Sequence, residues 1–247
     1  MTLLAWRRAG DQEATDRPAV VLIHPWAGSG ADWERAGWTA GLVEAGLDVW
    51  VPDLPGHGDS ADVRIPKAAV GVSWSATAVL ADLDKLGIRR FAVAAYADAC
   101  PVAAHLAVRA PERTTGLVLV GCDDRVAFPY GKEAAGALRN QRMRVWQPEV
   151  AALLRRARAN RNADPDVLAA WLEEAPWPAA ARLGALRTPT LLAVGTEDGA
   201  RARVPRLAQL FFDAHLATVT GDAETVLESE VLIQTVADFL TPAVDRR

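Results

Sequence analysis

Short apolar runs alternate with longer amphipathic segments from Pro18 to about Gly121. The apolar runs, such as 20–23 and 117–120, consist almost entirely of Val, Leu, Ile and Ala, which is typical of strands buried on both faces. The alternation indicates βαβ units, and therefore a mostly parallel sheet covered by helices on both faces. Helices are predicted near 31–45, 73–86, 99–110, 202–211 and 227–240, and further strands begin near Asp48, Phe91, Thr190 and His215.

This alternation breaks down between Asp124 and Arg187, where no segment has the pattern of a strand. Several helical segments follow one another there, punctuated by Pro148, Pro165, Pro176 and Pro178. The chain has 247 residues, 51% of them hydrophobic, which is enough for one well-buried α/β domain with an insertion. We therefore expect an α/β core made of residues 1–123 and 188–247, with a helical insertion over 124–187.

The formal net charge of −4 argues against nucleic acid as a partner, because phosphate binding relies on an excess of basic residues. The apolar run before Arg7 is too short for a signal peptide, and no stretch reaches the ~18 apolar residues of a membrane-spanning helix. We therefore expect a cytoplasmic protein with no membrane partner. The two cysteines, Cys100 and Cys122, match no metal motif, so we expect buried free thiols and no metal or other cofactor.

A strand, a sharp turn and a small-residue helix are predicted over 91–101, where the sequence reads FAVAAYADACP. This is the frame of an elbow that lifts a Ser, Cys or Asp nucleophile to the tip of a sheet, between two small residues. Ala95 and Ala99 occupy the two small positions, so the frame is complete. The nucleophile's position is held by Ala97, which has no group that can attack a substrate.

Two loops follow buried strands, HPWAGSG at 24–30 and DLPGHGDS at 53–60. With the elbow and the order of strands, they resemble the α/β-hydrolase family over nearly the whole chain. The resemblance implies that family's fold, with a helical cap inserted after the sixth family strand. It also implies that the nucleophile's position is Ala97 and not Asp98, because an Asp98 nucleophile would put Tyr96 where a small residue is needed.

The same resemblance locates the other two members of a catalytic triad. The acid position corresponds to Asp198, in the segment GTED after the penultimate strand, and the histidine position corresponds to Glu224, in GDAE. The four histidines lie elsewhere, at His24, His57, His105 and His215. Without a hydroxyl and an imidazole, the chain cannot run an ordinary acyl-enzyme mechanism.

What such a site could still do depends on the groups that remain. If the family geometry holds, the backbone N–H groups of Trp26 and Asp98 form an oxyanion hole. Asp198 and Glu224 could form a carboxylate pair that shares a proton, since like charges at short range raise the pKa of one partner. Such a pair would suit an elimination, isomerisation or cyclisation. The alternative is that Glu224 points to solvent and that Asp98 only caps its helix.

Ligand-binding candidates gather at the carboxyl ends of the predicted strands, the rim where open α/β sheets bind ligands. They are Tyr96, Cys122, Asp123 and Asp124. Asp123 or Asp124 could replace the catalytic acid, or both could simply cap a turn. In the insertion, Trp146, Trp171 and Trp177 could form, with Trp26, an aromatic wall for an apolar ligand; ordinary packing would explain them equally well.

Within this insertion, seven arginines fall between positions 139 and 161: Arg139, Arg142, Arg144, Arg155, Arg156, Arg158 and Arg161. They form either a solvated helix face or a basic surface for an acidic partner, such as a carrier protein or an anionic ligand. Three functions therefore remain open. The chain is a lyase, isomerase or cyclase without a covalent intermediate, a catalytically silent binding or partner-interaction protein, or a serine esterase-like hydrolase in which Ala97 replaces an original serine.

Overall fold

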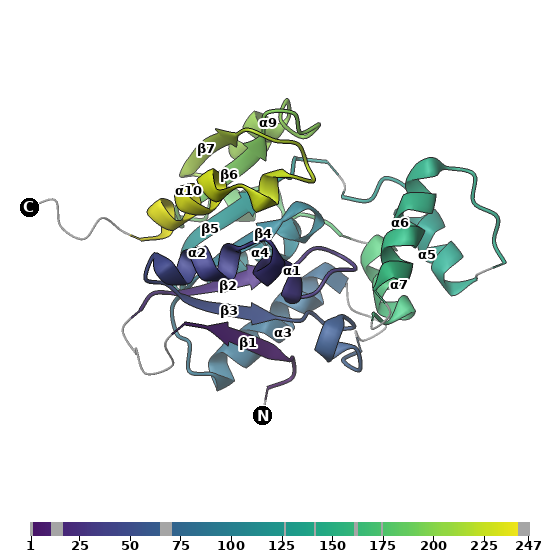
Figure 1. Cartoon of the computed structure of the whole chain (residues 1–247), viewed down its shortest axis with the longest axis horizontal. Coiled ribbons are helices and arrows are strands. Elements are labelled where there is room, and N and C mark those ends of the chain that lie inside the picture. Colours follow the sequence, from purple (N-terminus) through teal and green to yellow (C-terminus); the bar gives the residue numbers. More distant parts are fainter. Residues whose placement is uncertain are drawn as a thin grey trace, which may run out of the picture.

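The computed structural model describes residues 2–10, 17–64, 71–125, 127–140, 142–160, 163–173 and 175–241. Within them, one seven-stranded sheet has the order β1-β3-β2-β4-β5-β6-β7, parallel throughout except for the antiparallel pair β1 and β3 (Figure 1). The strands are β1 (Trp6–Ala9), β2 (Ala19–Ile23), β3 (Asp48–Pro52), β4 (Phe91–Tyr96), β5 (Thr114–Val120), β6 (Thr190–Gly195) and β7 (Ala214–Val219). The predicted mostly parallel sheet flanked by helices is confirmed.

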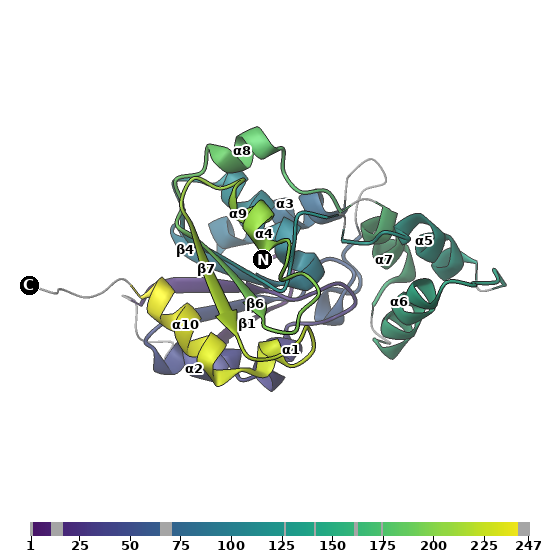
Figure 2. The ribbon, with the colours of Figure 1, turned by 90° about the horizontal axis from the view of Figure 1, so that it is seen from above.

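Helices cover both faces of this sheet (Figure 2). On one face lie α1 (Ala31–Arg35), α2 (Trp38–Glu44) and α10 (Glu230–Leu240), and on the other α3 (Gly71–Lys85), α4 (Cys100–Arg109), α8 (Ala180–Gly184) and α9 (Val204–Ala208). The sheet has a hydrophobic core on each face, and alternate residues of its central strands point into one core or the other. In β2, Val21 and Ile23 face α3 and α4. Val20 and Leu22 face α2 and α10. The near-continuous apolar strands therefore fill two cores at once.

Three of the predicted helices differ from those observed, and one of them, predicted over 202–211, covers only Val204–Ala208. The segment 31–45 forms two helices instead of one, because the chain turns at Gly37, whose φ of +80° is a left-handed conformation that glycine adopts readily. The last predicted helix begins at Glu230 and not at Leu227. Ser229 caps it, since the Ser229 hydroxyl accepts a hydrogen bond from the N–H of Leu232.

Three helices that follow β5 and precede β6 in the sequence lie beyond one end of the sheet (Figure 1). They are α5 (Gly131–Arg139), α6 (Pro148–Ala159) and α7 (Pro165–Glu173), and together they are called the helical insertion below. The predicted insertion, 124–187, also contains α8. The structure places α8 against α4 of the core, where Arg182 donates a hydrogen bond to the carbonyl of Val108.

The helical insertion is joined to the core mainly through α7. Trp171 is fully buried and packs edge-to-face on His57, with ring centroids 5.6 Å apart. The indole N–H of Trp26 donates to the carbonyl of Leu168, 3.0 Å away.

Among the described helices, none has both the length and the apolar character that crossing a bilayer requires.

Candidate functional site

A strained turn links β4 to α4. Ala97 has a φ of +51°, in the left-handed region that costs a residue with a Cβ roughly 1–2 kcal/mol. The two small residues that flank the turn, Ala95 and Ala99, are fully buried, so larger side chains would have no room there. The structure therefore has the backbone of a nucleophile elbow, and the residue at its tip presents a methyl group.

The carboxylate of Asp98 lies between the elbow, the loop after β2 and the helical insertion. Its Oδ1 accepts the backbone N–H of Trp26 at 2.6 Å, and its Oδ2 pairs with the guanidinium of Arg156 at 2.8 Å. The Asp98 side chain is 9% exposed. Of the two predicted oxyanion-hole residues, one therefore uses its side chain to occupy the backbone donor of the other.

Arg156 belongs to α6, and further contacts join this helix to the loop after β2. The guanidinium of Arg156 lies over the indole of Trp26, 5.6 Å from the ring centroid. The side-chain amide of Asn160 donates to the carbonyls of Ala27 and Gly28, at 3.1 and 3.0 Å. The position of α6 is thus coupled to the loop that would supply an oxyanion donor.

Two buried histidines hold the loops around this region in place. The Nε2 of His24 accepts the N–H of Leu54, and the Nε2 of His57 accepts the N–H of Ala27. Each Nδ1 lies within hydrogen-bonding distance of a proline carbonyl, so the neutral Nδ1–H form satisfies both rings. Burial, with the neighbouring His24, lowers the pKa of His57 to about 3, and burial also lowers the pKa of His24. Both imidazoles are neutral structural groups.

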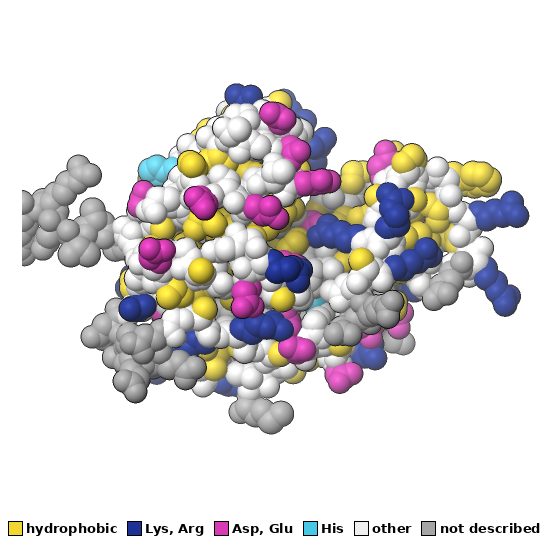
Figure 3. Space-filling view, in the orientation of Figure 1, with side chains coloured by type: hydrophobic (Ala, Val, Ile, Leu, Met, Phe, Trp, Pro, Cys, Tyr) yellow, Lys and Arg dark blue, Asp and Glu magenta, His cyan; other side chains and the backbone are white. Residues whose placement is uncertain are grey.

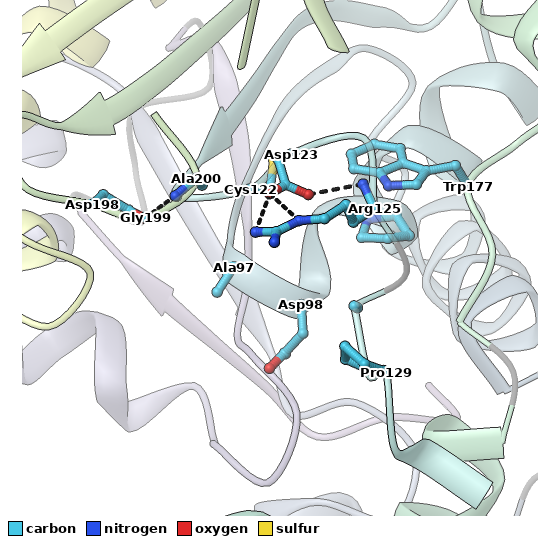
Figure 4. Close-up of a pocket in the computed structure, with 13 residues that line it drawn as sticks. Ala97, Asp98, Cys122, Asp123, Arg125, Pro129, Trp177, Asp198, Gly199 and Ala200 are labelled. Carbon is cyan, nitrogen blue, oxygen red and sulfur yellow. Dashed lines mark hydrogen bonds and ion pairs between the residues drawn. The ribbon is translucent and has the colours of Figure 1, made fainter. Parts of the chain in front are cut away.

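A cavity of about 400 Å³ opens beside the elbow (Figure 4). Its lining comes from the elbow and α4, the segment after β5, the segment after α7 and the loop after β6. The lining residues are Ala97, Asp98, Pro101, Gly121, Cys122, Asp123, Arg125, Ala127, Pro129, Trp177, Asp198, Gly199 and Ala200. Arg125 extends into the cavity and binds Asp123 through its Nε at 2.7 Å (Figure 4).

Asp198 lines this cavity at the end of β6. Its Oδ1 accepts the backbone N–H of Ala200 at 2.8 Å. Its Oδ2 is buried and has no hydrogen-bond partner among the described residues. Burial, followed by the negative charge of Asp198, raises the pKa of Tyr96 to about 12, so this phenol stays protonated.

The structure does not bring Glu224 to Asp198. Glu224 is exposed, does not line the cavity, and its carboxylate makes no hydrogen bond or ion pair with the described residues. The reason is local: Asp222 accepts hydrogen bonds from the N–H groups of Glu224 and Thr225 and from the Thr225 hydroxyl. This compact turn directs the chain toward α10 and leaves the predicted carboxylate pair unassembled.

Of the predicted aromatic wall, Trp177 alone lines the cavity. Trp26 and Trp171 are fully buried in the core, and Trp146 is 79% exposed on the surface. Tyr96 lies behind the elbow, beside Gly121, and is not part of the lining. Of the three tryptophans of the predicted insertion, only Trp171 is therefore fully buried against the core.

The polar candidates after β5 divide between two roles. Cys122 and Asp123 line the cavity, whereas Asp124 forms an ion pair with Arg203 at 2.8 Å. Asp123 also accepts the backbone N–H of Arg125, as a turn-capping residue does. Sequence reasoning missed Arg125, although its position two residues after Asp123 is the available signal for this turn. No three His, Cys, Asp or Glu side chains of the described residues are grouped to hold a metal ion.

The arginines of the helical insertion have different surroundings. Arg139 pairs with Glu173, and Arg156 pairs with Asp98. Arg142, Arg144, Arg155 and Arg158 are exposed, and Figure 3 shows basic side chains gathered on this part of the molecule. Arg161 lies outside the described residues.

Known proteins resemble parts of this sequence. The chain is 29% identical over 140 residues to the pimeloyl-[acyl-carrier protein] methyl ester esterase of Vibrio parahaemolyticus serotype O3:K6, covering 51% of this chain and 43% of that protein. It is 36% identical over 72 residues to the same-named esterase of Vibrio atlanticus, covering 24% of this chain and 27% of that protein. The chain therefore spans less than half the length of these curated relatives.

Solved structures match over nearly the whole chain. The enol-lactonase of Burkholderia xenovorans LB400 has a TM-score of 0.78 at 22% identity, covering 97% of this chain and 96% of that one. A thermophilic esterase of Thermogutta terrifontis has a TM-score of 0.75 at 22% identity, covering 96% and 92%. At this identity the likeness concerns the fold. The family model described as "alpha/beta hydrolase fold" matches residues 18–145, more than half of the sequence, and the chain belongs to that family.

Proposed function

We propose that this protein is a catalytically silent member of the family, which binds a small, largely apolar ligand beneath the helical insertion acting as a cap. The observation that carries the proposal is the hydrogen bond from the Trp26 N–H to the Asp98 carboxylate. A substrate carbonyl would need that N–H in an acyl transfer, and it would have to displace a tethered, charged acceptor held by Arg156.

The side chains around the elbow support the same conclusion. Ala97 offers no nucleophile, and no histidine is among the residues that line the cavity. His24 and His57 are fully buried, His105 is bonded to the carbonyl of Pro176, and His215 pairs with Asp213. Ser-His-Asp chemistry needs both a hydroxyl and a base that can reach it.

Non-hydrolytic chemistry has less support than silent binding. A shared-proton pair requires two carboxylates at short range, and Glu224 is exposed on a turn away from the cavity lining. The names of the relatives, esterase and enol-lactonase, describe hydrolases. A lyase, isomerase or cyclase therefore ranks below a binding protein.

The binding role is supported by what remains at the site. A cavity of about 400 Å³ is the size of a small organic ligand, and its lining includes Pro101, Ala127, Pro129 and the half-buried Trp177. The helical insertion is tied down by contacts with the loop after β2, at Trp26, Ala27 and Gly28. The cavity lining itself comes from the core and from the segments on either side of the helical insertion, and a preformed cavity can hold a ligand without reacting with it.

The test measures ester hydrolysis and ligand content together. We expect the wild-type protein and Ala97→Ser to hydrolyse p-nitrophenyl butyrate at the buffer rate, because no base reaches position 97. We expect native mass spectrometry of the purified protein to detect a bound small molecule. Strong hydrolysis by Ala97→Ser would overturn the proposal in favour of a serine esterase-like protein whose serine has been replaced.

The alternative chemistry has its own control. Glu224→Gln would abolish any turnover that depends on a Glu224–Asp198 pair, whereas we expect it to leave ligand binding unchanged. If a copurified molecule were converted by the wild type and not by Glu224→Gln, the silent-binding proposal would be wrong.

A second proposal concerns a partner. Arg142 and Arg144 are exposed and close in sequence to Trp146, whose exposed fraction is 79%, and Arg155 and Arg158 are exposed on α6. This combination of positive charge and an exposed aromatic ring suits an acidic protein surface. The names of two relatives include an acyl-carrier protein, which makes an acidic carrier protein the first partner to test.

Titration calorimetry with a purified acyl carrier protein at low and high salt tests this partner. We expect binding that weakens as salt rises, and that is lost in Arg142→Glu/Arg144→Glu. The matched control, Arg89→Glu/Arg90→Glu, reverses two exposed arginines on the core. Equal losses in the two variants would show only a non-specific charge effect and would contradict the proposal.

A further inference from the structure

With one exception, each charged side chain that lines the cavity has an ion-pair partner. Asp98 is neutralised by Arg156, and Asp123 is neutralised by Arg125, whose Nε and terminal nitrogen approach it at 2.7 and 2.5 Å. Asp198 has no basic partner among the described residues. The lining therefore has one uncompensated negative charge, and it lies at the end of β6.

An uncompensated carboxylate in such a place is costly. Its Oδ2 is buried, and a buried acceptor without a hydrogen bond loses the solvation that it had in water. The apolar walls beside Asp198 lower the local dielectric constant and strengthen its attraction for a positive charge. A ligand cation in the cavity would attract the Asp198 carboxylate through space and offset part of this cost, whereas a ligand anion would add to it.

The opposite side of the cavity is apolar. Figure 4 shows Trp177 across the cavity from Asp198, with Cys122 and the ion pair of Asp123 and Arg125 between them and Ala97 to one side. Pro101 and Pro129 also belong to the lining. The polar groups between the two sides, Asp123 and Arg125, are paired with each other, so the cavity has an unpaired negative group at one end and an apolar surface at the other.

We propose that the cavity binds an organic monocation, an amine with an aromatic or branched hydrocarbon arm, and this inference rests on the proposed binding function. The ammonium group lies near Asp198 and the arm lies against Trp177. The paired Arg125 contributes little repulsion, because Asp123 neutralises it at hydrogen-bond distance. The cavity beside Ala97 and Asp198 is therefore a binding site that selects ligands by their charge.

Three probes of nearly the same shape test the charge preference: benzylamine, benzyl alcohol and benzoate. Their affinities are measured at pH 7 by isothermal titration calorimetry, with saturation-transfer NMR for weak binders. We expect benzylamine to bind about tenfold more tightly than benzyl alcohol, as a partly screened charge pair implies, and benzoate to bind most weakly.

Two variants test whether Asp198 causes the preference for the cation and whether Trp177 contacts the hydrocarbon arm. Asp198→Asn removes the charge and keeps the side-chain shape, and we expect it to abolish the advantage of benzylamine over benzyl alcohol. The matched control Asp62→Asn removes one exposed carboxylate outside the cavity lining, and the advantage should persist. Trp177→Leu should weaken benzylamine and benzyl alcohol by similar factors, because it removes apolar contact and no charge.

The possible failures are distinguishable. Equal binding of benzylamine and benzyl alcohol to the wild type, or an unchanged advantage in Asp198→Asn, would overturn the charge preference and leave the binding function standing. If no probe binds and the purified protein holds no small molecule, the binding function fails as well. Should Asp198→Asn not fold, salt dependence decides: added NaCl must weaken benzylamine but not benzyl alcohol, and equal responses would contradict the inference.

Discussion

The backbone N–H of Trp26 donates to the side chain of Asp98, 2.6 Å away, across an interval of 72 residues. In an α/β-hydrolase fold these two residues would each offer a backbone N–H to a reacting oxygen. Here a carboxylate of the protein itself takes one of those donors, and Arg156 from the helical insertion holds it there. One side chain thus connects the elbow, the loop after β2 and α6.

We expect Arg156→Met to loosen α6 from the core. The change keeps most of the hydrocarbon length and removes the ion pair with Asp98, which is worth about 1 kcal/mol because Arg156 is partly exposed. Amide hydrogen exchange in α6 should accelerate, as measured by mass spectrometry. The control is Arg155→Met, which changes an exposed arginine of the same helix. Equally faster exchange in both variants would show that the ion pair with Asp98 does not hold α6 in place.

Ala97→Gly should stabilise the protein by up to ~1 kcal/mol. The φ of +51° strains an alanine but not a glycine, and this gain exceeds the extra chain entropy that glycine has when unfolded. Ala99→Gly is the matched control. Ala99 has a φ of −86° and a buried methyl group, so its loss should destabilise the protein by about 1 kcal/mol or more. Urea unfolding measures both, and the same sign for both changes would refute the strain argument.

The buried histidines predict how stability depends on pH. The pKa of His57 falls to about 3 in the folded protein, mainly through burial, whereas in the unfolded chain it is about 6.5. The unfolded state therefore binds more protons below pH 6.5. Stability should be complete above that pH and should decrease progressively as the pH falls toward 3, with the lowered pKa of His24 adding to the loss.

Urea midpoints between pH 4 and 7 measure this dependence. We expect His57→Gln to have a shallower slope than the wild type, whatever its absolute stability, because one group with a depressed pKa has been removed. If the urea midpoint of His57→Gln changed with pH as steeply as that of the wild type, the pH dependence would come from other groups.

Two glycines of α5 should respond to alanine in opposite ways. A Cβ at Gly131 would overlap the carbonyl oxygen of Leu172, where α5 and α7 cross, so Gly131→Ala should destabilise the protein by about 2 kcal/mol or more. At Gly136 the nearest atom to a Cβ is the sulfur of Met143, at 3.5 Å. Gly136→Ala should therefore stabilise the helix by up to ~1 kcal/mol. Thermal melting of the two variants compares them directly.

The fold was predictable because periodicity is a local property. The Val and Leu runs of β2 and β5 are apolar on both faces, and only a sheet covered on both sides buries them. The short edge strand β1 was missed, since its four residues, WRRA, are half-buried and carry no apolar pattern. The break at Gly37 was missed because an isolated glycine does not by itself end a helix.

The sequence by itself determined that position 97 has no nucleophile and that no histidine stands at position 224, since chemical identity does not depend on folding. Only the tertiary structure decided what those changes mean. It gave Asp98 the N–H of Trp26 and the charge of Arg156, left Asp198 without a basic partner in the described part of the chain, and turned Glu224 to solvent. Hydrogen bonds and charge pairs between residues 58 or 72 positions apart depend on distances in space, which no local pattern encodes.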